Sequence, residues 1–290
     1  MLNKLGGFKQ LGIRLQVMLF LEFEFGKSLS RKLARVLAVL LLSGALSCCV
    51  TTTTGGFMAD ASEERAATDY IQLALAYFDN RDMPGARRHV NNALDIDNGI
   101  SDAYMVLAMI FQREGDLDLA DSNYQRAISL DKDNSSARNN YAAMLFSQER
   151  FRESYEQLER VANDTSYEGR SLVFEGLGRS ALRLGRQEEA KAAFQRALQL
   201  NENLFIAPLE LALIYFDQQD YPRARQYYRN YLTTIQFLQL PHTPRALLAG
   251  IQIEGYFQNK EFVENFSLVL STLYPTSPEY QTFQRLSDAN

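Results

Sequence analysis

Apolar residues recur three and four positions apart from about residue 67 to residue 274, which is the spacing of helices with one apolar face. The pattern also repeats on a longer scale, because equivalent residues return after 34 positions. The first two units share an aromatic, a small and a second aromatic residue: Tyr70, Ala74 and Tyr77, then Tyr104, Ala108 and Phe111. A period of this length, with two apolar stretches per unit, predicts stacked pairs of helices.

These positions are those of the tetratricopeptide repeat, in which a small residue lies where the two helices of a unit cross. Five units carry that small residue: Ala74, Ala108, Ala142, Gly178 and Ala212. A larger side chain there would push the two helix backbones apart. We therefore expect an all-α fold, a right-handed superhelical solenoid of about six tetratricopeptide repeats whose sixth unit is degenerate.

The expected repeat domain spans residues 67–274 and is followed by a C-terminal tail or cap over residues 275–290. Its units lie near residues 67–100, 101–134, 135–170, 171–204, 205–240 and 241–274. The fourth unit starts 36 residues after the third, and the polar residues 163–168 supply the two extra positions as a longer loop. Pro275 and Pro278 are expected to end the solenoid, because proline cannot continue a helix.

The amino-terminal region has the order of a signal peptide. Residues 28–35 carry three positive charges, and residues 36–50 carry none. This apolar run is shorter than the roughly 20 residues of a spanning helix, so we expect it to be cleaved. The leader is unusually long, and translation could instead start later, at Met18.

The end of this run, Leu46 to Cys49, resembles the bacterial lipobox. We expect signal peptidase II to remove residues 1–48 and Cys49 to carry the lipid, with Cys48 as the alternative frame. Residues 49–66 would then form a lipid-anchored flexible tether. Val50 stands where an aspartate would retain a lipoprotein in the inner membrane, which implies the periplasmic face of the outer membrane in a Gram-negative bacterium.

Charge and candidate chemistry exclude several classes of function. Removing the leader leaves 23 basic and 33 acidic residues, a net charge of about −10, which is unsuited to a nucleic-acid backbone. His89 and His242 lie far apart, the two cysteines are adjacent, and Glu188 and Glu189 fall on expected exposed helix positions. We therefore expect no metal, no cofactor, no small-molecule substrate and no enzymatic activity.

The expected binding surface is the concave face, formed by first-helix positions that the packing signature leaves free. Eight apolar residues are the candidate partner contacts: Ile71, Leu75, Phe78, Met105, Met109, Phe146, Leu213 and Phe216. Exposed together, they would form an apolar patch of the kind that marks a protein-binding site. Alternatively, residues 57–66 fold back into this groove and make these side chains part of the core. An asparagine ladder or peptide-terminus clamp is disfavoured, because only Asn140 stands at the required position.

The lipobox, Cys49 with its threonine-rich continuation, and about six repeats together resemble the type IV pilus pilotin family (PilW/PilF), which are tetratricopeptide-repeat outer-membrane lipoproteins. That resemblance implies a non-catalytic scaffold that binds the outer-membrane secretin and supports its localisation and multimerisation in type IV pilus biogenesis. A lipoprotein adaptor for peptidoglycan hydrolases or for outer-membrane assembly would share the leader and the repeats, and is the alternative.

Overall fold

The computed structural model describes the backbone of residues 56–288 and the side chains of residues 62–288. The expected leader, residues 1–48, the expected lipid attachment at Cys49 and the possible start at Met18 lie outside the described residues. Within the described residues no helix is both long enough and apolar enough to span a membrane.

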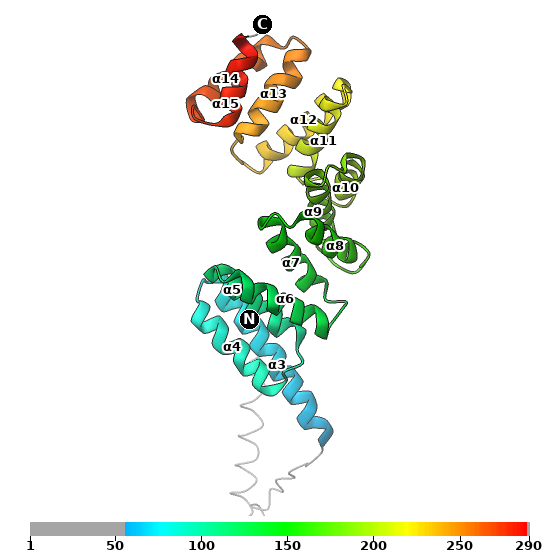
Figure 1. Ribbon diagram of the computed structural model, residues 1–290, viewed down its shortest axis with the longest axis vertical. Helices are drawn as coiled ribbons and strands as arrows, with labels where there is room; N and C mark the ends of the chain where they lie inside the picture. The colour runs from blue at the N-terminus through cyan, green and yellow to red at the C-terminus, as the bar shows by residue number, and fades with distance from the viewer. Residues whose placement is uncertain (1–55, 289–290) are drawn as a thin grey trace, which may run out of the picture. The chain divides into compact units, whose positions relative to one another are not determined.

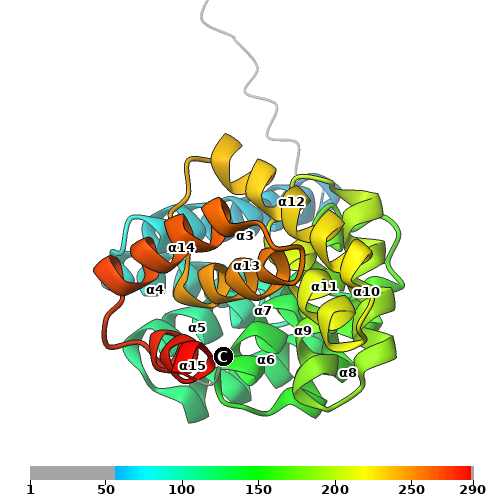
Figure 2. The same ribbon diagram turned by 90° about the horizontal axis from the view of Figure 1, so that it is seen from above.

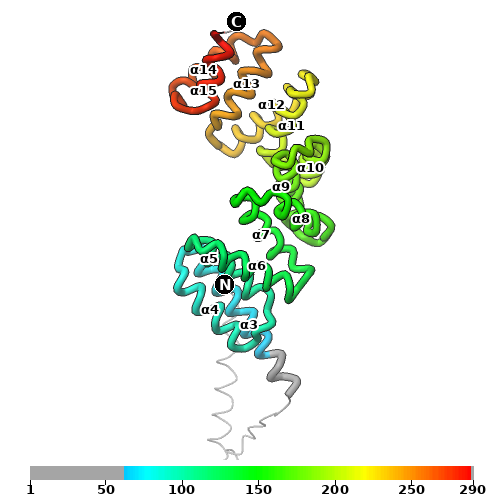
Figure 3. Tube along the Cα trace, viewed as in Figure 1, coloured from blue at the N-terminus to red at the C-terminus, as the bar shows by residue number. Residues whose placement is uncertain are grey.

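The described chain is helical, and its helices follow one another as antiparallel pairs joined by short turns (Figure 1, Figure 3). The pairs are α3 (Gly56–Asp79) with α4 (Met83–Ile96), α5 (Ser101–Glu114) with α6 (Leu117–Leu130), α7 (Ser135–Ser147) with α8 (Phe151–Ala162), α9 (Arg170–Arg183) with α10 (Gln187–Leu200), α11 (Ile206–Asp217) with α12 (Tyr221–Phe237), and α13 (Pro244–Tyr256) with α14 (Lys260–Leu273). The expected all-α repeat solenoid is therefore confirmed.

The small residues expected at the helix crossings are buried. Ala74, Ala108, Ala142 and Ala212 are each 0 % exposed. Gly178 has no room even for a methyl group, because a Cβ atom there would lie 2.6 Å from the Phe194 ring. The small side chains thus set the distance between paired helices.

Each helix pair turns through one residue with a left-handed backbone conformation. This residue is Arg81, Gly115, Glu149, Gly185, Gln219 or Gln258, with φ between 58° and 89°. The next residue donates its backbone N–H across the turn, as in the 2.9 Å bond from Asp116 to the Phe111 carbonyl. This is the Schellman closure of a helix end, which favours but does not require glycine.

Both ends of the array carry helix beyond the repeat units, which differs from the expected tether at the amino-terminal end and fits the cap alternative at the carboxyl-terminal end. The tether expected over residues 49–66 is helical from residue 56, because α3 begins at Gly56 and continues into the first repeat. This helix also contradicts the alternative in which residues 57–66 fold back into the groove. At the other end, α15 (Pro278–Asp288) packs against α13, with Tyr280 and Phe283 against the cluster of Leu247, Ile251 and Leu270 (Figure 1, Figure 2). The carboxyl-terminal segment thus includes a helical cap.

Candidate protein-binding face

The first helices of successive repeats contact one another: α5 contacts α7, α7 contacts α9, and α9 contacts α11. The surface formed by α3, α5, α7, α9 and α11 is termed the inner face below. All eight candidate partner residues lie on these helices. The structure therefore places them on one series of helices, and burial decides which of them another molecule can reach.

Three of the eight candidates are buried: Ile71, Phe78 and Met105 are 4 %, 7 % and 6 % exposed. The expectation that they are exposed is wrong. They belong to the core cluster that joins the first repeats. Five candidates remain half-buried and accessible: Leu75, Met109, Phe146, Leu213 and Phe216.

Asn140 ties the second and third repeats together beneath this face. Its side-chain nitrogen lies 3.7 Å from the sulfur of Met105 and 3.9 Å from the sulfur of Met109. A thioether sulfur is a weak acceptor, so these contacts orient the methionines without fixing them firmly. Asn140 therefore has an internal role within the scaffold.

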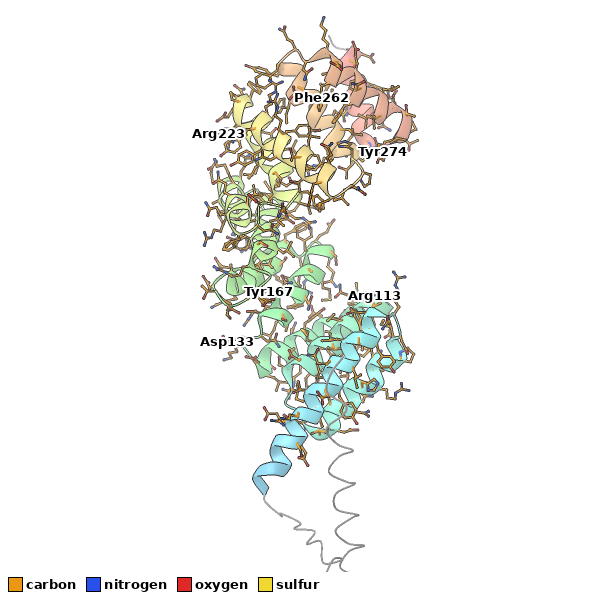
Figure 4. All side chains as sticks on the ribbon, turned by 180° about the vertical axis from the view of Figure 1, so that it is seen from behind. Arg113, Asp133, Tyr167, Arg223, Phe262 and Tyr274 are labelled. Atoms are coloured by element: carbon orange, nitrogen blue, oxygen red, sulfur yellow. The ribbon has the colours of Figure 1, made fainter. Side chains whose placement is uncertain are left out.

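Arginine side chains cover several of the aromatic rings on and beside this face. The Arg113 guanidinium lies 4.7 Å from the Phe78 ring centre, Arg179 lies 4.6 Å from Phe146, and Arg183 lies 4.2 Å from Phe151. Figure 4 labels Arg113, which stands in the last turn of α5. The face is thus not the continuous apolar strip that the sequence predicts, because cations alternate with apolar side chains along it.

Buried carboxylates replace apolar residues on the first helices of the last three repeats. Glu175, Glu210 and Glu254 are 7 %, 7 % and 2 % exposed. The Arg245 guanidinium donates two hydrogen bonds to the Glu210 carboxylate, and Arg225 donates two to Glu254 at 2.8 and 2.6 Å. The sequence reasoning missed these pairs. The available signal was a glutamate on a first helix with an arginine roughly one repeat away, after Glu210 in one pair and before Glu254 in the other.

Glu175 accepts the backbone N–H of Ala207, in the first turn of α11, at 3.1 Å, and among the described residues no arginine forms a hydrogen bond with it. Burial raises the pKa of Glu175, while the Ala207 hydrogen bond and the Arg179 charge act in the opposite direction and the nearby Glu210 charge adds to the rise. The carboxylate therefore caps a helix at some cost in desolvation.

Replacing Glu175 with glutamine is expected to raise the free energy of unfolding at pH 7 by about 0.5–1 kcal/mol, because the amide oxygen can still accept the Ala207 bond without a buried charge. A carboxyl group whose folded-state pKa is raised contributes most stability below its unfolded pKa of about 4.3 and loses it as pH rises through the folded value. The advantage of the Glu175→Gln variant should therefore vanish below about pH 4. Urea unfolding at both pH values measures this, and a less stable variant at pH 7 would show that the charge itself stabilises α11.

The two histidines have separate, largely aromatic surroundings. The His89 ring lies 4.9 Å from the Tyr77 ring centre, and His242 lines a small apolar pocket with Phe262 and Phe266. Burial lowers the pKa of His242. Among the described residues no group of three or more His, Cys, Asp or Glu side chains is placed to hold a metal ion.

A polar groove of about 1050 Å³ runs beside α7 and α8. Basic residues Lys132, Arg138 and Arg160 line it together with several carboxylates, including Glu156 and Asp164. Arg138 is held by the carbonyl of Lys132 and by Gln157, at 2.9 and 2.6 Å. Because both signs of charge are interleaved, the groove offers no single-sign binding site.

Comparisons with known proteins agree with this architecture. Two family models described as tetratricopeptide repeat match residues 101–134 and 176–236. The type IV pilus assembly protein PilF of Pseudomonas aeruginosa is 35 % identical over 251 residues, which is 86 % of this chain and 98 % of PilF. A solved structure from the functional characterisation of Pseudomonas aeruginosa PilF aligns with a TM-score of 0.72 over 77 % of this chain and 99 % of the other. The crystal structure of PilW, a widely conserved type IV pilus biogenesis factor, aligns at 24 % identity with a TM-score of 0.62, covering 75 % and 98 % of the two chains, and shares the fold.

Proposed function

Because this chain belongs to the family of the type IV pilus assembly protein PilF, we propose that it is a non-catalytic, lipid-anchored scaffold that binds the outer-membrane secretin and supports its localisation and multimerisation. As a tetratricopeptide-repeat protein of type IV pilus biogenesis, it has a fold that serves protein–protein contact. The observation that carries the proposal is the likeness to PilF over almost the whole length of that protein.

The anchor in this proposal is a lipid on Cys49 at the periplasmic face of the outer membrane. Helix α3 begins at Gly56, seven residues beyond Cys49. An extended chain of seven residues reaches at most about 25 Å. The amino-terminal end of α3 would therefore be held close to the membrane surface, so that the first repeat is the unit nearest to a secretin that inserts into the same membrane.

The proposal is tested at Leu75 and Met109, two half-buried apolar residues in neighbouring repeats. In the Leu75→Asp/Met109→Asp variant an apolar partner segment would have to bury two unpaired charges, so we expect affinity for the secretin to fall about tenfold or more. Cells carrying the variant should have few secretin multimers and little twitching motility. Semi-denaturing gels of outer membranes and stab-agar motility assays measure the two effects.

The matched control is Leu117→Asp/Leu119→Asp, which places the same two charges at leucines that are 40 % and 43 % exposed on the second helix α6. This control should assemble secretin normally. Both proteins must show the mass of a lipidated chain that begins at Cys49 and normal circular dichroism. Intact secretin multimers in the Leu75→Asp/Met109→Asp cells would refute this binding surface. A deletion strain with normal pili but a defective cell wall would support the adaptor alternative instead.

A further inference from the structure

Three arginines on the inner face lie over aromatic rings of the preceding repeat. Arg113 lies over Phe78, and Arg179 lies over Phe146. Arg183 lies over Phe151, at the start of α8. Stacking restrains a guanidinium plane and leaves the N–H groups on its edge directed away from the ring. All three arginines are nevertheless exposed to solvent.

Among the described residues, these N–H groups lack the close anionic partner that some other stacked arginines have. Arg87 stacks on Phe111 and also bonds Glu114 at 2.6 Å. Within the described part of the chain, Arg113 and Arg179 form no ion pair closer than 4.0 Å, and Arg183 reaches only Glu149, at 3.9 Å. The Glu149 side chain is 79 % exposed, so solvent screens this contact strongly.

Two of the three stacked arginines, together with an exposed leucine, lie on one face of helix α9. Leu172, Arg179 and Arg183 are spaced by seven and four residues, so they share one helix face. Leu172, two turns before Arg179, is 58 % exposed. The carboxylate one turn before Arg179 belongs to Glu175, which already accepts the Ala207 N–H. An exposed leucine and two exposed cations therefore share this helix face, and among the described residues neither arginine has an ion pair shorter than 3.9 Å.

We propose that Leu172, Arg179 and Arg183 form a docking site for an acidic segment of a protein partner, with Arg113 as a second contact two repeats away. Each guanidinium would donate two parallel hydrogen bonds to a carboxylate of that segment. An apolar side chain of the same segment would cover Leu172. This inference rests on the proposed function, since it specifies the chemistry of the protein that the scaffold binds.

Charge complementarity favours an acidic peptide segment over an anionic membrane. The chain beyond the leader carries a net charge of about −10, which repels an extended anionic surface. A narrow segment can approach the three cations while avoiding most of the acidic surface. The planar guanidinium edges and the adjacent leucine also suit a chain in which carboxylates and apolar residues alternate.

The experiment compares a labelled peptide of alternating glutamate and leucine with the same peptide carrying glutamine, each titrated by fluorescence anisotropy against the detergent-solubilised protein at low salt. We expect the glutamate peptide to bind about tenfold more tightly than the glutamine peptide. Arg179→Gln/Arg183→Gln should remove that preference and leave thermal unfolding unchanged. The control Arg152→Gln/Arg196→Gln removes the same charge from exposed positions on second helices and should keep the preference.

Absence of a preference for glutamate in the wild-type protein would overturn the inference. An equal loss in the control would also overturn it, since general electrostatics would then account for binding. Binding to phosphatidylglycerol vesicles that Arg179→Gln/Arg183→Gln abolishes, without any effect on the peptides, would assign the cations to lipid. None of these results affects the secretin assembly test at Leu75 and Met109, so the two proposals fail separately.

Discussion

Replacing Arg225 with methionine is expected to lower the free energy of unfolding at pH 7 by about 3 kcal/mol, because it leaves a buried carboxylate without its ion-pair partner. Glu254 is 2 % exposed and receives two hydrogen bonds from Arg225 and one of 2.9 Å from Asn259. Methionine retains most of the aliphatic volume beside Phe257. The loss of unfolding free energy should therefore come from removal of the Arg225 charge, and urea unfolding followed by circular dichroism measures it.

Two controls isolate this pair. Arg229→Met removes the same charge from an arginine that is 62 % exposed and 4.0 Å from Glu254, so it should cost less than about 0.5 kcal/mol. Arg225→Met/Glu254→Met removes both charges and should recover most of the loss, since well-packed apolar residues can replace a buried ion pair. Equal costs for Arg225→Met and Arg229→Met would contradict the assigned pairing.

The pH dependence of this variant has a definite sign. Burial alone would raise the pKa of Glu254, but hydrogen bonds from Arg225 and Asn259, with the charges of Arg225 and Arg229, hold it below the ordinary value. Such a group contributes stability above its unfolded pKa of about 4.3, and that stability is lost as pH falls through the folded value. Without Arg225 the buried carboxyl should take up a proton more readily. The difference between the wild-type protein and Arg225→Met should therefore shrink below about pH 4.

The repeat architecture was predictable because the two helices of every unit must pack at the same close distance. A small residue at the helix crossing is the only side chain that permits close approach, so its return after 34 residues is visible in the sequence. The turn residues were less visible. Glycine marks the left-handed position at Gly115 and Gly185, whereas Arg81, Glu149 and Gln219 adopt the same conformation without a distinctive residue type.

Burial on the inner face could not be predicted from register alone, because it depends on how closely neighbouring first helices approach. Ile71 and Phe78 are buried in the core cluster of the first repeats, although their positions in the repeat suggested exposure. The reverse occurs at Leu73, which has the packing position of Leu211 but is 44 % exposed while Leu211 is 0 % exposed. Within the described residues, Leu73 has no preceding repeat to cover it. The packing signature is thus reliable only where a unit has neighbours on both sides.

Two glycines of α13, each replaced with alanine, should change the free energy of unfolding in opposite directions. A Cβ atom at Gly250 would lie 2.6 Å from Cζ of Tyr228, whereas one at Gly255 would meet only Val263, at 3.8 Å. Tyr228 cannot easily move away, since it is 0 % exposed and its hydroxyl donates a 2.8 Å hydrogen bond to the Ala246 carbonyl. Gly250→Ala must therefore displace either a helix or a buried hydrogen bond.

We expect Gly250→Ala to lower the free energy of unfolding by about 2 kcal/mol, as overpacking of a close contact commonly does. Gly255→Ala should raise it by about 0.5–1 kcal/mol, because alanine is the better helix former and has room there. Urea unfolding of both variants gives the difference, about 3 kcal/mol, which cancels any effect common to glycine replacement in this helix. Equal changes in unfolding free energy would mean that the Tyr228 side chain moves aside with little loss of stability. Gly250 would then not set the spacing between the fifth and sixth repeats. Opposite responses would show that the close contact of Gly250 with Tyr228 sets the spacing between the fifth and sixth repeats.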